Sequence, residues 1–361
     1  MRILVVNAGS SSLKLALLDR DDETLGAREL EAPGGRAPEG ALASTLDELG
    51  APDAVGHRIV HGGPRLTAPA LVDDELRDAL RDVAALAPLH VPPALEVLDA
   101  VGEALPGIPM VACFDTAFHA TLAPEAFTYA VPAEWRERLA VRRYGFHGLS
   151  HAYAARRTAE LLGRDDLRLV TCHLGAGASL CAVRGGRSVD TTMGFTPLEG
   201  LVMATRSGTV DPGLVTWLIE HAGLDAGAVS NALEHDSGLQ GLAGTPDMRA
   251  VLARDDDTAR LALGVYGHRL RAAIAAMAAG LGGIDALCFT GGIGERSAPV
   301  RALAADGLGF LGVAIDRAAN AAAAADAEIG ARGATVRTVV VAAREDLEIA
   351  RQVRAVVPPT A

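Results

Sequence analysis

One local pattern occurs twice in this chain: a short apolar strand, a turn of small residues, and a second apolar strand. The first copy joins residues 3–6 to residues 13–19, and the second joins residues 167–172 to residues 180–183. Two strands joined by a tight turn predict a β-hairpin. A P-loop would instead lead into a helix and end in Gly-Lys-Ser/Thr, so the pattern argues against one. We therefore expect an internal duplication that begins near the start of each half.

Segments with strand and helix patterns alternate after each copy. The further strands are expected at 54–61, 110–114, 286–290 and 335–341, and the helices at 40–49, 73–87, 94–104, 151–162, 260–279, 316–327 and 346–357. This order predicts the α/β class, with two related domains flanking a cleft.

Composition narrows the function classes. The chain has 361 residues, 50% of them hydrophobic, which is enough for two domains. A formal net charge of -12 without a Lys/Arg run argues against nucleic-acid binding. The chain opens on an apolar strand, and glycines interrupt its most apolar stretch, 272–290, so we expect neither a secretion signal nor a membrane span. Four cysteines in apolar runs, without a C-x-x-C pair, predict reduced thiols and a cytoplasmic protein.

The two small-residue turns can offer backbone N–H groups to phosphate oxygens. Ser10 and Ser12 add hydroxyl donors to the first turn, and Asn7 offers a neutral oxygen to a metal. Lys14 is the only lysine among 33 basic residues, so its place beside this turn indicates a specific use of the ammonium. One such turn could be an ordinary hairpin, but two turns and a glycine run at 291–294 favour a nucleotide site.

Arg58 and Val60 alternate along one predicted strand and therefore share a face. A guanidinium beside a small apolar group matches a short carboxylic acid, which has charge at one end and a methyl group at the other. Leu89, Phe146 and Pro197, from other apolar segments, could close the methyl pocket. The alternative for Arg58 is a structural ion pair.

Phosphoryl transfer to an ionised carboxylate requires positive charge more than a strong base. His147 lies between glycines, and Arg206 lies in a polar loop before a helix, so both can supply that charge. Asp115 and Glu345 each follow a predicted strand, where α/β sites gather, and could hold a metal.

With these residues in view, the sequence resembles the acetate kinase family across essentially its whole length. The similar stretches are residues 7–14, 56–63, 87–93, 114–119, 143–151, 171–179, 188–212, 290–295 and 345–350. The run Met-Gly-Phe-Thr-Pro-Leu-Glu-Gly at 193–200 is the most specific of them. The resemblance implies two duplicated ribonuclease-H-like (actin-like ATPase) domains, Mg²⁺ or Mn²⁺, ATP as co-substrate, acetate as acceptor and a homodimer.

The resemblance also implies domain boundaries and roles for residues. The first domain would comprise 1–119 with a returning helix at 347–361, and the second, for nucleotide binding and dimerisation, would comprise 120–346. The implied catalytic residues are Asp115, His147, Arg206 and Arg58; the acetate site adds Val60, Leu89, His90, Phe146 and Pro197; and the metal positions are Asn7 and Glu345. The implied ATP contacts are Lys14, Ser10, Ser12, His173, Leu174, Gly175, Ala176, Gly177, Asp247, Met248, Arg249, Gly292, Ile293, Gly294, Glu295 and Arg296.

Four positions depart from the family pattern. Ala176, Val91, Arg296 and Arg344 stand where asparagine is common. Ala176 removes one expected donor to the phosphates, which bears on donor affinity and identity.

Three other functions fit parts of the pattern. Propionate kinase is the nearest, because one methylene in an apolar pocket is worth only about 1–3 kcal/mol. A sugar or polyol kinase of the same superfamily would use Asp115 as a base but would need a larger polar pocket. A non-catalytic nucleotide-gated binding protein would be favoured by loss of Arg58 or Arg206, and both are present.

Overall fold

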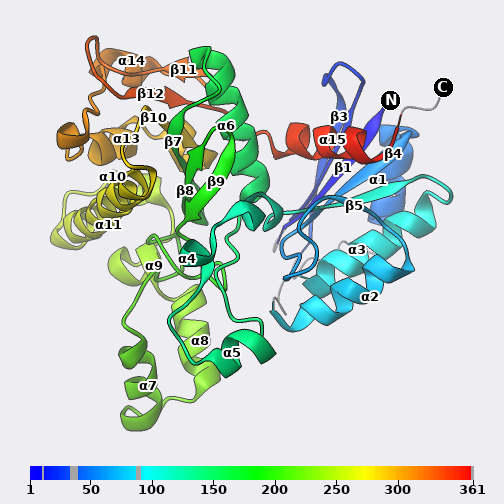
Figure 1. The fold of residues 1–361 in the computed structure, drawn as a ribbon, viewed down its shortest axis with the longest axis horizontal. Coiled ribbons are helices and arrows are strands. Elements are labelled where there is room, and N and C mark those ends of the chain that lie inside the picture. The colour runs from blue at the N-terminus through cyan, green and yellow to red at the C-terminus, as the bar shows by residue number, and fades with distance from the viewer. Residues whose placement is uncertain (10–11, 33–39, 87–90, 359–361) are drawn as a thin grey trace. The chain divides into compact units, whose positions relative to one another are not determined.

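The structure is a computed structural model that describes residues 1–9, 12–32, 40–86 and 91–358 (Figure 1). Its contacts divide the chain into two compact units. Unit 1 comprises Met1–Ala120, Phe146–Tyr153 and Arg344–Ala361, and unit 2 comprises Thr121–Gly145 and Ala154–Ala343. The predicted domains, 1–119 with 347–361 and 120–346, stay a prediction. They assign residues 146–153 and 344–346 to the second domain, whereas the contacts place these residues in unit 1.

Unit 1 contains a mixed six-stranded sheet with the order β3-β2-β1-β4-β6-β5. Its strands are β1 Ile3–Ala8, β2 Ser12–Leu18, β3 Thr24–Glu31, β4 Ala54–Ile59, β5 Ala70–Leu71 and β6 Met110–Phe114. Its helices are α1 Ala41–Leu49, α2 Asp74–Val83, α3 Val91–Ala104 and α15 Glu345–Val356. Strands β1 and β2 are antiparallel, as a hairpin requires, whereas β4 is parallel to both β1 and β6.

Unit 2 repeats this arrangement, with the order β11-β12-β10-β7-β8-β9. Its strands are β7 Arg168–Leu174, β8 Ala178–Arg184, β9 Arg187–Thr191, β10 Ala286–Thr290, β11 Ala327–Glu328 and β12 Arg337–Val340. Reversed, this order matches that of unit 1 strand for strand, and the parallel and antiparallel pairings agree as well. The predicted α/β fold with duplicated domains is therefore confirmed.

Helices connect the strands of unit 2 and extend beyond its sheet. They are α4 Pro124–Phe127, α5 Ala133–Arg138, α7 Pro212–His221, α8 Ala226–His235, α9 Gly238–Ala243, α10 Met248–Leu252, α11 Asp257–Leu281, α12 Gly291–Arg296, α13 Ala298–Ala305 and α14 Arg317–Ala322. Helix α6, Gly148–Leu162, begins in unit 1 and ends in unit 2.

The same two hydrogen bonds join the starts of the central parallel strands in both sheets, β1 with β4 and β7 with β10. In unit 1, the backbone N–H of Arg2 donates to Asp53 Oδ2 at 2.6 Å, and Asp53 N–H donates to Arg2 O at 2.8 Å. In unit 2, the backbone N–H of Arg168 donates to Asp285 Oδ2 at 2.9 Å, and Asp285 N–H donates to Arg168 O at 2.8 Å. The duplication thus extends to single hydrogen bonds.

Strands β1 and β4 at the centre of the first sheet are buried on both faces, which explains their apolar runs. Alternate residues Ile3 and Val5 pack with Ile349 and Val353 of α15. Leu4 and Val6 face the opposite way and pack with α1 and α3, through side chains such as Leu46, Val97 and Val101. Residues at odd positions of β1 therefore face α15, and this places Asn7 on that side.

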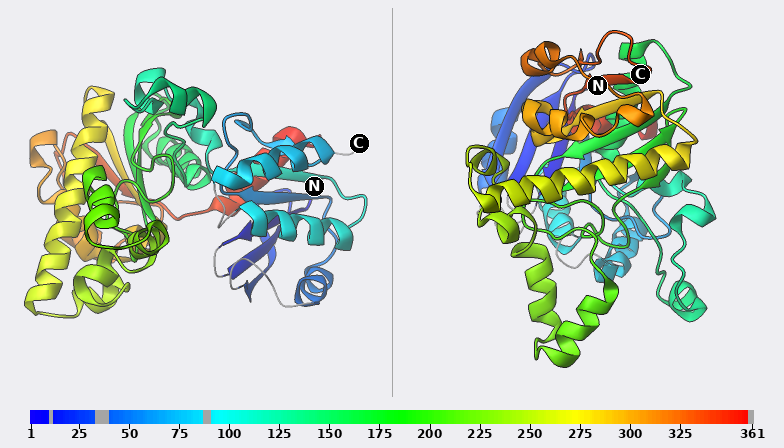
Figure 2. Two further views of the ribbon diagram at one scale, coloured as in Figure 1. Left: turned by 90° about the horizontal axis from the view of Figure 1, so that it is seen from below. Right: turned by 90° about the vertical axis from the view of Figure 1, so that its left-hand side faces the viewer.

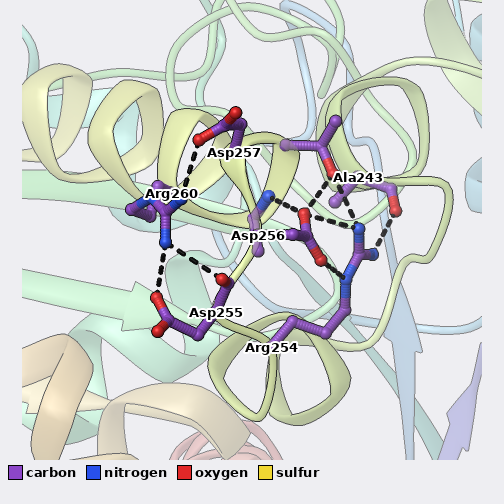
Figure 3. A network of polar contacts seen from close by, with 8 residues as sticks. Ala243, Arg254, Asp255, Asp256, Asp257 and Arg260 are labelled. Atoms are coloured by element: carbon purple, nitrogen blue, oxygen red, sulfur yellow. Dashed lines mark hydrogen bonds and ion pairs between the residues drawn. The ribbon is translucent and has the colours of Figure 1, made fainter.

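Helix α11 covers one face of the second sheet and contacts β7, β8 and β9 (Figure 2). Its first turn is fixed by a polar network (Figure 3). Asp256 is the N-cap and accepts from Ala259 N–H at 3.0 Å, while Arg254 donates to Asp256 at 2.7 Å and to Ala243 O at 2.6 Å. The Arg254 hydrogen bonds hold the pKa of Asp256 below its ordinary value, so this cap stays ionised.

Several local predictions are confirmed and others are wrong. Asp73 caps α2, accepting from Leu76 N–H at 2.8 Å. The third strand of each sheet, β3 and β9, was missed, because β3 is largely exposed and carries little apolar signal. The glycine run at 291–294 is the start of helix α12, and the helix expected at 316–327 ends at Ala322.

Within the described ranges, no helix combines the length and apolar character that a bilayer-crossing segment needs. The four cysteines are buried free thiols.

Replacing Asp285 by Asn should lower the Tm, because Arg168 donates to this carboxylate through its backbone, Nε and Nη2. The hydrogen bonds of Arg168 lower the pKa of Asp285 from 3.8 to about 2. Because this pKa is depressed, the stabilisation is complete above about pH 4 and is lost as the pH falls through about 2. The Tm difference between wild type and Asp285→Asn should therefore shrink as the pH is lowered from 5 to 2. A Tm difference independent of pH would contradict this account.

Candidate functional site

Four polar side chains of unit 1 meet at the carboxyl ends of β1, β4 and β6, where ligands of α/β sheets bind. Arg58 Nη2 contacts Asp115 Oδ2 at 2.6 Å, and its Nε donates to the same oxygen at 3.1 Å. Arg58 Nη1 donates to Asn7 Oδ1 at 3.1 Å, and Asn7 Nδ2 donates to Glu345 Oε2 at 2.9 Å. The structure thus brings together the predicted acceptor-binding, catalytic and metal residues of this unit.

The Arg58–Asp115 ion pair lies largely out of water, with side-chain exposures of 16% and 1%. Burial raises the pKa of Asp115, and Arg58 partly offsets that effect. Burial alone would lower the pKa of Arg58, but Asp115 and Glu345 more than compensate, so the guanidinium stays charged. The structural ion pair considered for Arg58 therefore exists.

That ion pair does not use the whole guanidinium. Arg58 has five N–H donors. The hydrogen bonds to Asp115 and Asn7 occupy Nε and one donor on each terminal nitrogen. Among the described residues, these hydrogen bonds leave one donor on each terminal nitrogen for a second carboxylate, which arginine can bind in bidentate geometry.

The donor set around Asn7 fits Mg²⁺. Magnesium prefers oxygen ligands and is commonly held by one or two carboxylates together with waters and substrate phosphates. Asn7 Oδ1, Glu345 and Asp115 offer such oxygens within one hydrogen-bonded cluster. Among the described residues, no group of three or more His, Cys, Asp or Glu is arranged to hold a metal alone.

Apolar side chains lie close to this cluster in unit 1. Val60 follows β4 and is half-buried, and Phe146 is 1% exposed. Phe146 packs edge-on against His61, with ring centroids 5.4 Å apart, and its carbonyl lies 3.0 Å from His119 Nε2. Of the other residues predicted for the methyl pocket, Leu89 and His90 lie outside the described residues and Pro197 belongs to unit 2.

His147 is held in a conformation that non-glycine residues rarely adopt, with φ at 57°. Its neighbour Gly148 donates from N–H to Asp115 O at 2.9 Å, and a Cβ at Gly148 would clash with that carbonyl. Such backbone strain costs about 1–3 kcal/mol and persists where the surroundings enforce it. The backbone of Asp115 therefore fixes the position from which the His147 side chain projects.

The turn of the first hairpin is defined by Gly9 N–H, which donates to Ser12 O at 2.8 Å. Lys14 is paired with Asn7 across the hairpin, so both project from the same face of the sheet. Its side chain is 63% exposed, and the ammonium lies 3.9 Å from Glu29 Oε1, a weak ion pair that a phosphate could replace. Ser10 lies outside the described residues.

Unit 2 contains a pocket of about 620 Å³. Its walls come from the second hairpin turn, the start of α10 and the corner between α12 and α13: Gly175, Ala176, Ala204, Pro246, Asp247, Met248, Arg249, Leu252, Gly292, Ile293, Arg296, Ser297 and Pro299. Eight of the predicted ATP contacts, Gly175, Ala176, Asp247, Met248, Arg249, Gly292, Ile293 and Arg296, thus share one concave surface.

Five of the predicted ATP contacts in unit 2 do not line this pocket. They are His173, Leu174, Gly177, Gly294 and Glu295. Leu174 is buried in the core, and Glu295 accepts from Ala343 N–H at 2.9 Å, two residues before Glu345. Sequence reasoning missed Ala204, Pro246, Leu252, Ser297 and Pro299, whose apolar or small side chains carry no chemical signal.

The four departures from the family pattern have different surroundings. Ala176 and Arg296 line the pocket, and Arg296 Nε donates to Gly292 O at 3.2 Å. Val91 is buried at the start of α3, and Arg344 donates to Asp346 at 2.9 Å. Two of the four therefore bear directly on the pocket.

Arg206 of unit 2 is held on two edges. Its Nε lies 3.0 Å from Glu234 Oε2, and its Nη1 donates to Pro197 O at 3.3 Å. The Arg206 side chain is 24% exposed. Sequence reasoning missed Glu234, a single carboxylate in helix α8 that gives no local sign of its partner.

The acetokinase family profile matches residues 41–351 of this chain. The acetate kinase of Deinococcus deserti is 47% identical, over 99% of this chain and 98% of that protein. The acetate kinase of Acetivibrio thermocellus is 41% identical, over 98% of both chains.

Solved structures agree with the sequence relatives. The propionate kinase of Francisella tularensis superimposes with a TM-score of 0.92 at 33% identity, covering 99% of this chain and 100% of that one. The Porphyromonas gingivalis acetate kinase superimposes with a TM-score of 0.89 at 34% identity, covering 98% and 99%. From its family profile, its full-length relatives and its fold, this chain belongs to the acetokinase family.

Proposed function

We propose that this kinase transfers the γ-phosphoryl group of ATP to acetate, giving acetyl phosphate and ADP. The observation that carries the proposal is the placement of the Arg58 guanidinium, which Asp115 and Asn7 hold. Among the described residues, one N–H donor on each of Nη1 and Nη2 remains for an acceptor. Val60 and Phe146 supply apolar surface nearby in the same unit. This combination suits a carboxylate that carries a small alkyl group.

The acceptor needs orientation and charge more than proton removal. Its carboxylate is already ionised, so Asp115 serves to hold Arg58 and need not remove a proton from the acceptor. Arg58 binds the acceptor, and His147 is placed through the Asp115 backbone to stabilise the transferring group. Positioning and electrostatic stabilisation account for most phosphoryl-transfer catalysis.

Unit 2 would bind the nucleotide in the pocket that Ala176, Met248 and Ile293 help to form. Arg206 would supply positive charge to the transferring phosphoryl group; such an arginine is worth about 10³–10⁵ in rate. In unit 1, Asn7 and Glu345 would hold Mg²⁺, and Lys14 would contact the donor. Magnesium, when bound, would neutralise charge on the donor phosphates.

Propionate is the second candidate acceptor, favoured by the similarity to the propionate kinase of Francisella tularensis. A sugar or polyol acceptor would need polar groups beside Arg58 to bind its hydroxyls. Val60 and Phe146, the residues of unit 1 predicted for the acceptor pocket and described by the structure, are apolar.

A cytoplasmic location is proposed as well. It is supported by the four cysteines, which are buried as free thiols. Such thiols are typical of reducing compartments.

A homodimer is supported by helix α7, none of whose residues is buried. Leu214 is 42% and Trp217 is 54% exposed, and their spacing of three places both on one face of the helix. An exposed apolar face of this kind marks an association surface. A second copy of the chain is the proposed partner.

Purified protein with Mg²⁺, ATP and acetate should form an acyl phosphate that hydroxylamine traps as a hydroxamate. The value of kcat/KM should decline from acetate through propionate to butyrate, by about 10- to 200-fold for each methylene that the pocket rejects. An ATPase assay without acetate is the control. Absence of hydroxamate would exclude the proposed reaction, and a higher kcat/KM for propionate would make it the acceptor.

Replacing Ala176 by Asn should tighten ATP binding, because it adds an amide donor to the pocket wall beside the second hairpin turn. A hydrogen bond from an amide to a charged phosphate is worth about 1.5–3 kcal/mol, or roughly a 10- to 150-fold lower KM for ATP. The KM for acetate should stay unchanged. An unchanged or raised KM for ATP would show that Arg296 or another group already replaces the missing donor.

Replacing Trp217 by Asp should shift the protein toward monomer in sedimentation velocity, because it places a charge on the α7 face. Phe310 is 74% exposed and lies elsewhere in unit 2, so Phe310→Asp is the matched control and should not change the mass. An unchanged mass for Trp217→Asp would remove α7 from the interface.

A further inference from the structure

The segment 192–211 of unit 2 contains neither helix nor strand, yet it carries both Pro197 and Arg206. Backbone hydrogen bonds hold part of it, such as Ala204 N–H to Ala176 O at 3.0 Å and Ser207 N–H to Leu233 O at 3.1 Å, and side chains packed against it add further contacts. The most specific sequence motif, 193–200, lies inside this segment and has no role in the proposed chemistry beyond Pro197. The contacts of Glu199, the acidic residue of this motif, indicate a further role for the motif.

The Arg143 side chain hydrogen-bonds to the backbone at the start of the segment. Its Nη1 donates to three successive carbonyls, those of Thr191 at 3.1 Å, Thr192 at 3.0 Å and Met193 at 2.9 Å. Its Nη2 donates to Glu199 Oε1 at 2.8 Å. A single guanidinium thus connects the backbone at the beginning of the segment to the Glu199 carboxylate in its first half.

Tyr129 closes the network on the other side of Glu199. Its hydroxyl donates to Glu199 Oε2 and accepts from Phe195 N–H at 3.0 Å. Burial, reinforced by the hydrogen bond to Glu199, raises the pKa of Tyr129, so the phenol remains a donor. A Cβ at Gly194 would clash with both Glu199 and Tyr129, so the backbone lies directly against this pair.

The loop held in this way in turn holds Arg206. Pro197 lies between Phe195 and Glu199, and its carbonyl accepts from Arg206 Nη1 at 3.3 Å. Glu234 of α8 lies 3.0 Å from Arg206 Nε. The Arg206 guanidinium is therefore held by one contact from α8 and by two within its own segment, to Pro197 O and, at 3.9 Å from Nη1, to Met203 Sδ.

We propose that Arg143, Glu199 and Tyr129 are positioning residues that act through Pro197 and Arg206. They fix the loop so that the Arg206 guanidinium is already oriented when the phosphoryl group arrives. The proposal rests on the role of Arg206 in the proposed function. Misplacement of a catalytic group by about 1 Å can cost about a hundredfold in rate.

Charge explains why Glu199 and Arg143 act as a pair. Their side chains are only 33% and 16% exposed. Removing one partner of such a pair leaves the other charge poorly solvated, so the loop would rearrange to reach water. Glu199→Gln keeps the shape of the carboxyl group and removes its charge, and Tyr129→Phe removes one hydroxyl, so it is the milder change.

The test compares Glu199→Gln, Arg143→Lys and Tyr129→Phe with wild type and with Asp285→Asn. The last variant breaks a pair of the same unit that touches neither the loop nor the pocket, so it controls for lost stability. Hydrogen exchange of peptides covering 192–206 reports the loop whether or not acetate is the acceptor. Steady-state kinetics with acetate and ATP reports its consequence.

We expect faster exchange in 192–206 for Glu199→Gln and a smaller effect for Tyr129→Phe, with no change there for Asp285→Asn. The kcat should fall by about 10- to 100-fold in Glu199→Gln, with the KM for ATP within about twofold of wild type. Lysine in Arg143→Lys keeps the charge but loses the planar guanidinium. The kcat of this variant should lie between those of wild type and Glu199→Gln.

Two results would overturn the proposal: unchanged exchange in 192–206, or faster exchange with unchanged kcat. Should Glu199→Gln fail to fold, Tyr129→Phe decides by the same criteria. If wild type forms no acyl phosphate, the proposed function fails. The exchange measurement still decides whether the three residues brace the loop.

Discussion

The Arg58–Asp115 ion pair is the interaction on which the arrangement of unit 1 depends. It joins the ends of two parallel strands, β4 and β6, and reaches β1 through Asn7. A buried pair of this kind gains little net stability, because desolvation offsets most of the Coulomb attraction. Its value is geometric: Asp115 and Asn7 fix the guanidinium, and among the described residues one donor on each terminal nitrogen remains for an acceptor. The acceptor site follows from that constraint.

The same cluster links charge to backbone. Asp115 holds Arg58 through its side chain, and through its carbonyl it holds Gly148 and the strained backbone of His147. Asn7 connects Arg58 to Glu345, the first residue of α15. The predicted acceptor, metal and transition-state groups of unit 1 are therefore parts of one hydrogen-bonded assembly. A change in one of them should be felt by the others.

Sequence reasoning identified the elements whose pattern is local. Both hairpins, the parallel strands and the N-cap of α2 were predicted, because apolar alternation and capping chemistry act over a few residues. The polar strand β3 was missed because both of its faces are largely exposed. Asn7 and Asp115 could be found as candidates because they lie at the ends of strands, and Arg58 because it alternates with Val60 along a strand. Their mutual hydrogen bonds could not, because they join residues more than 50 positions apart.

The pairs that hold Arg206 show the same limit. Glu199 and Glu234 give no local signal, since an isolated carboxylate in a loop or helix resembles any solvated one. Only the fold brings them to Arg143 and Arg206.

The central claim is that the free edge of the Arg58 guanidinium binds the acceptor carboxylate. The most direct measurement is the KM for acetate of Arg58→Lys beside wild type at saturating Mg²⁺-ATP. Lysine keeps the charge but loses the planar fork, and a charge-assisted hydrogen bond is worth about 1.5–3 kcal/mol. We predict a KM for acetate raised by roughly 10- to 100-fold, with the KM for ATP unchanged. An unchanged KM for acetate would contradict the account and leave Arg58 with a structural role alone.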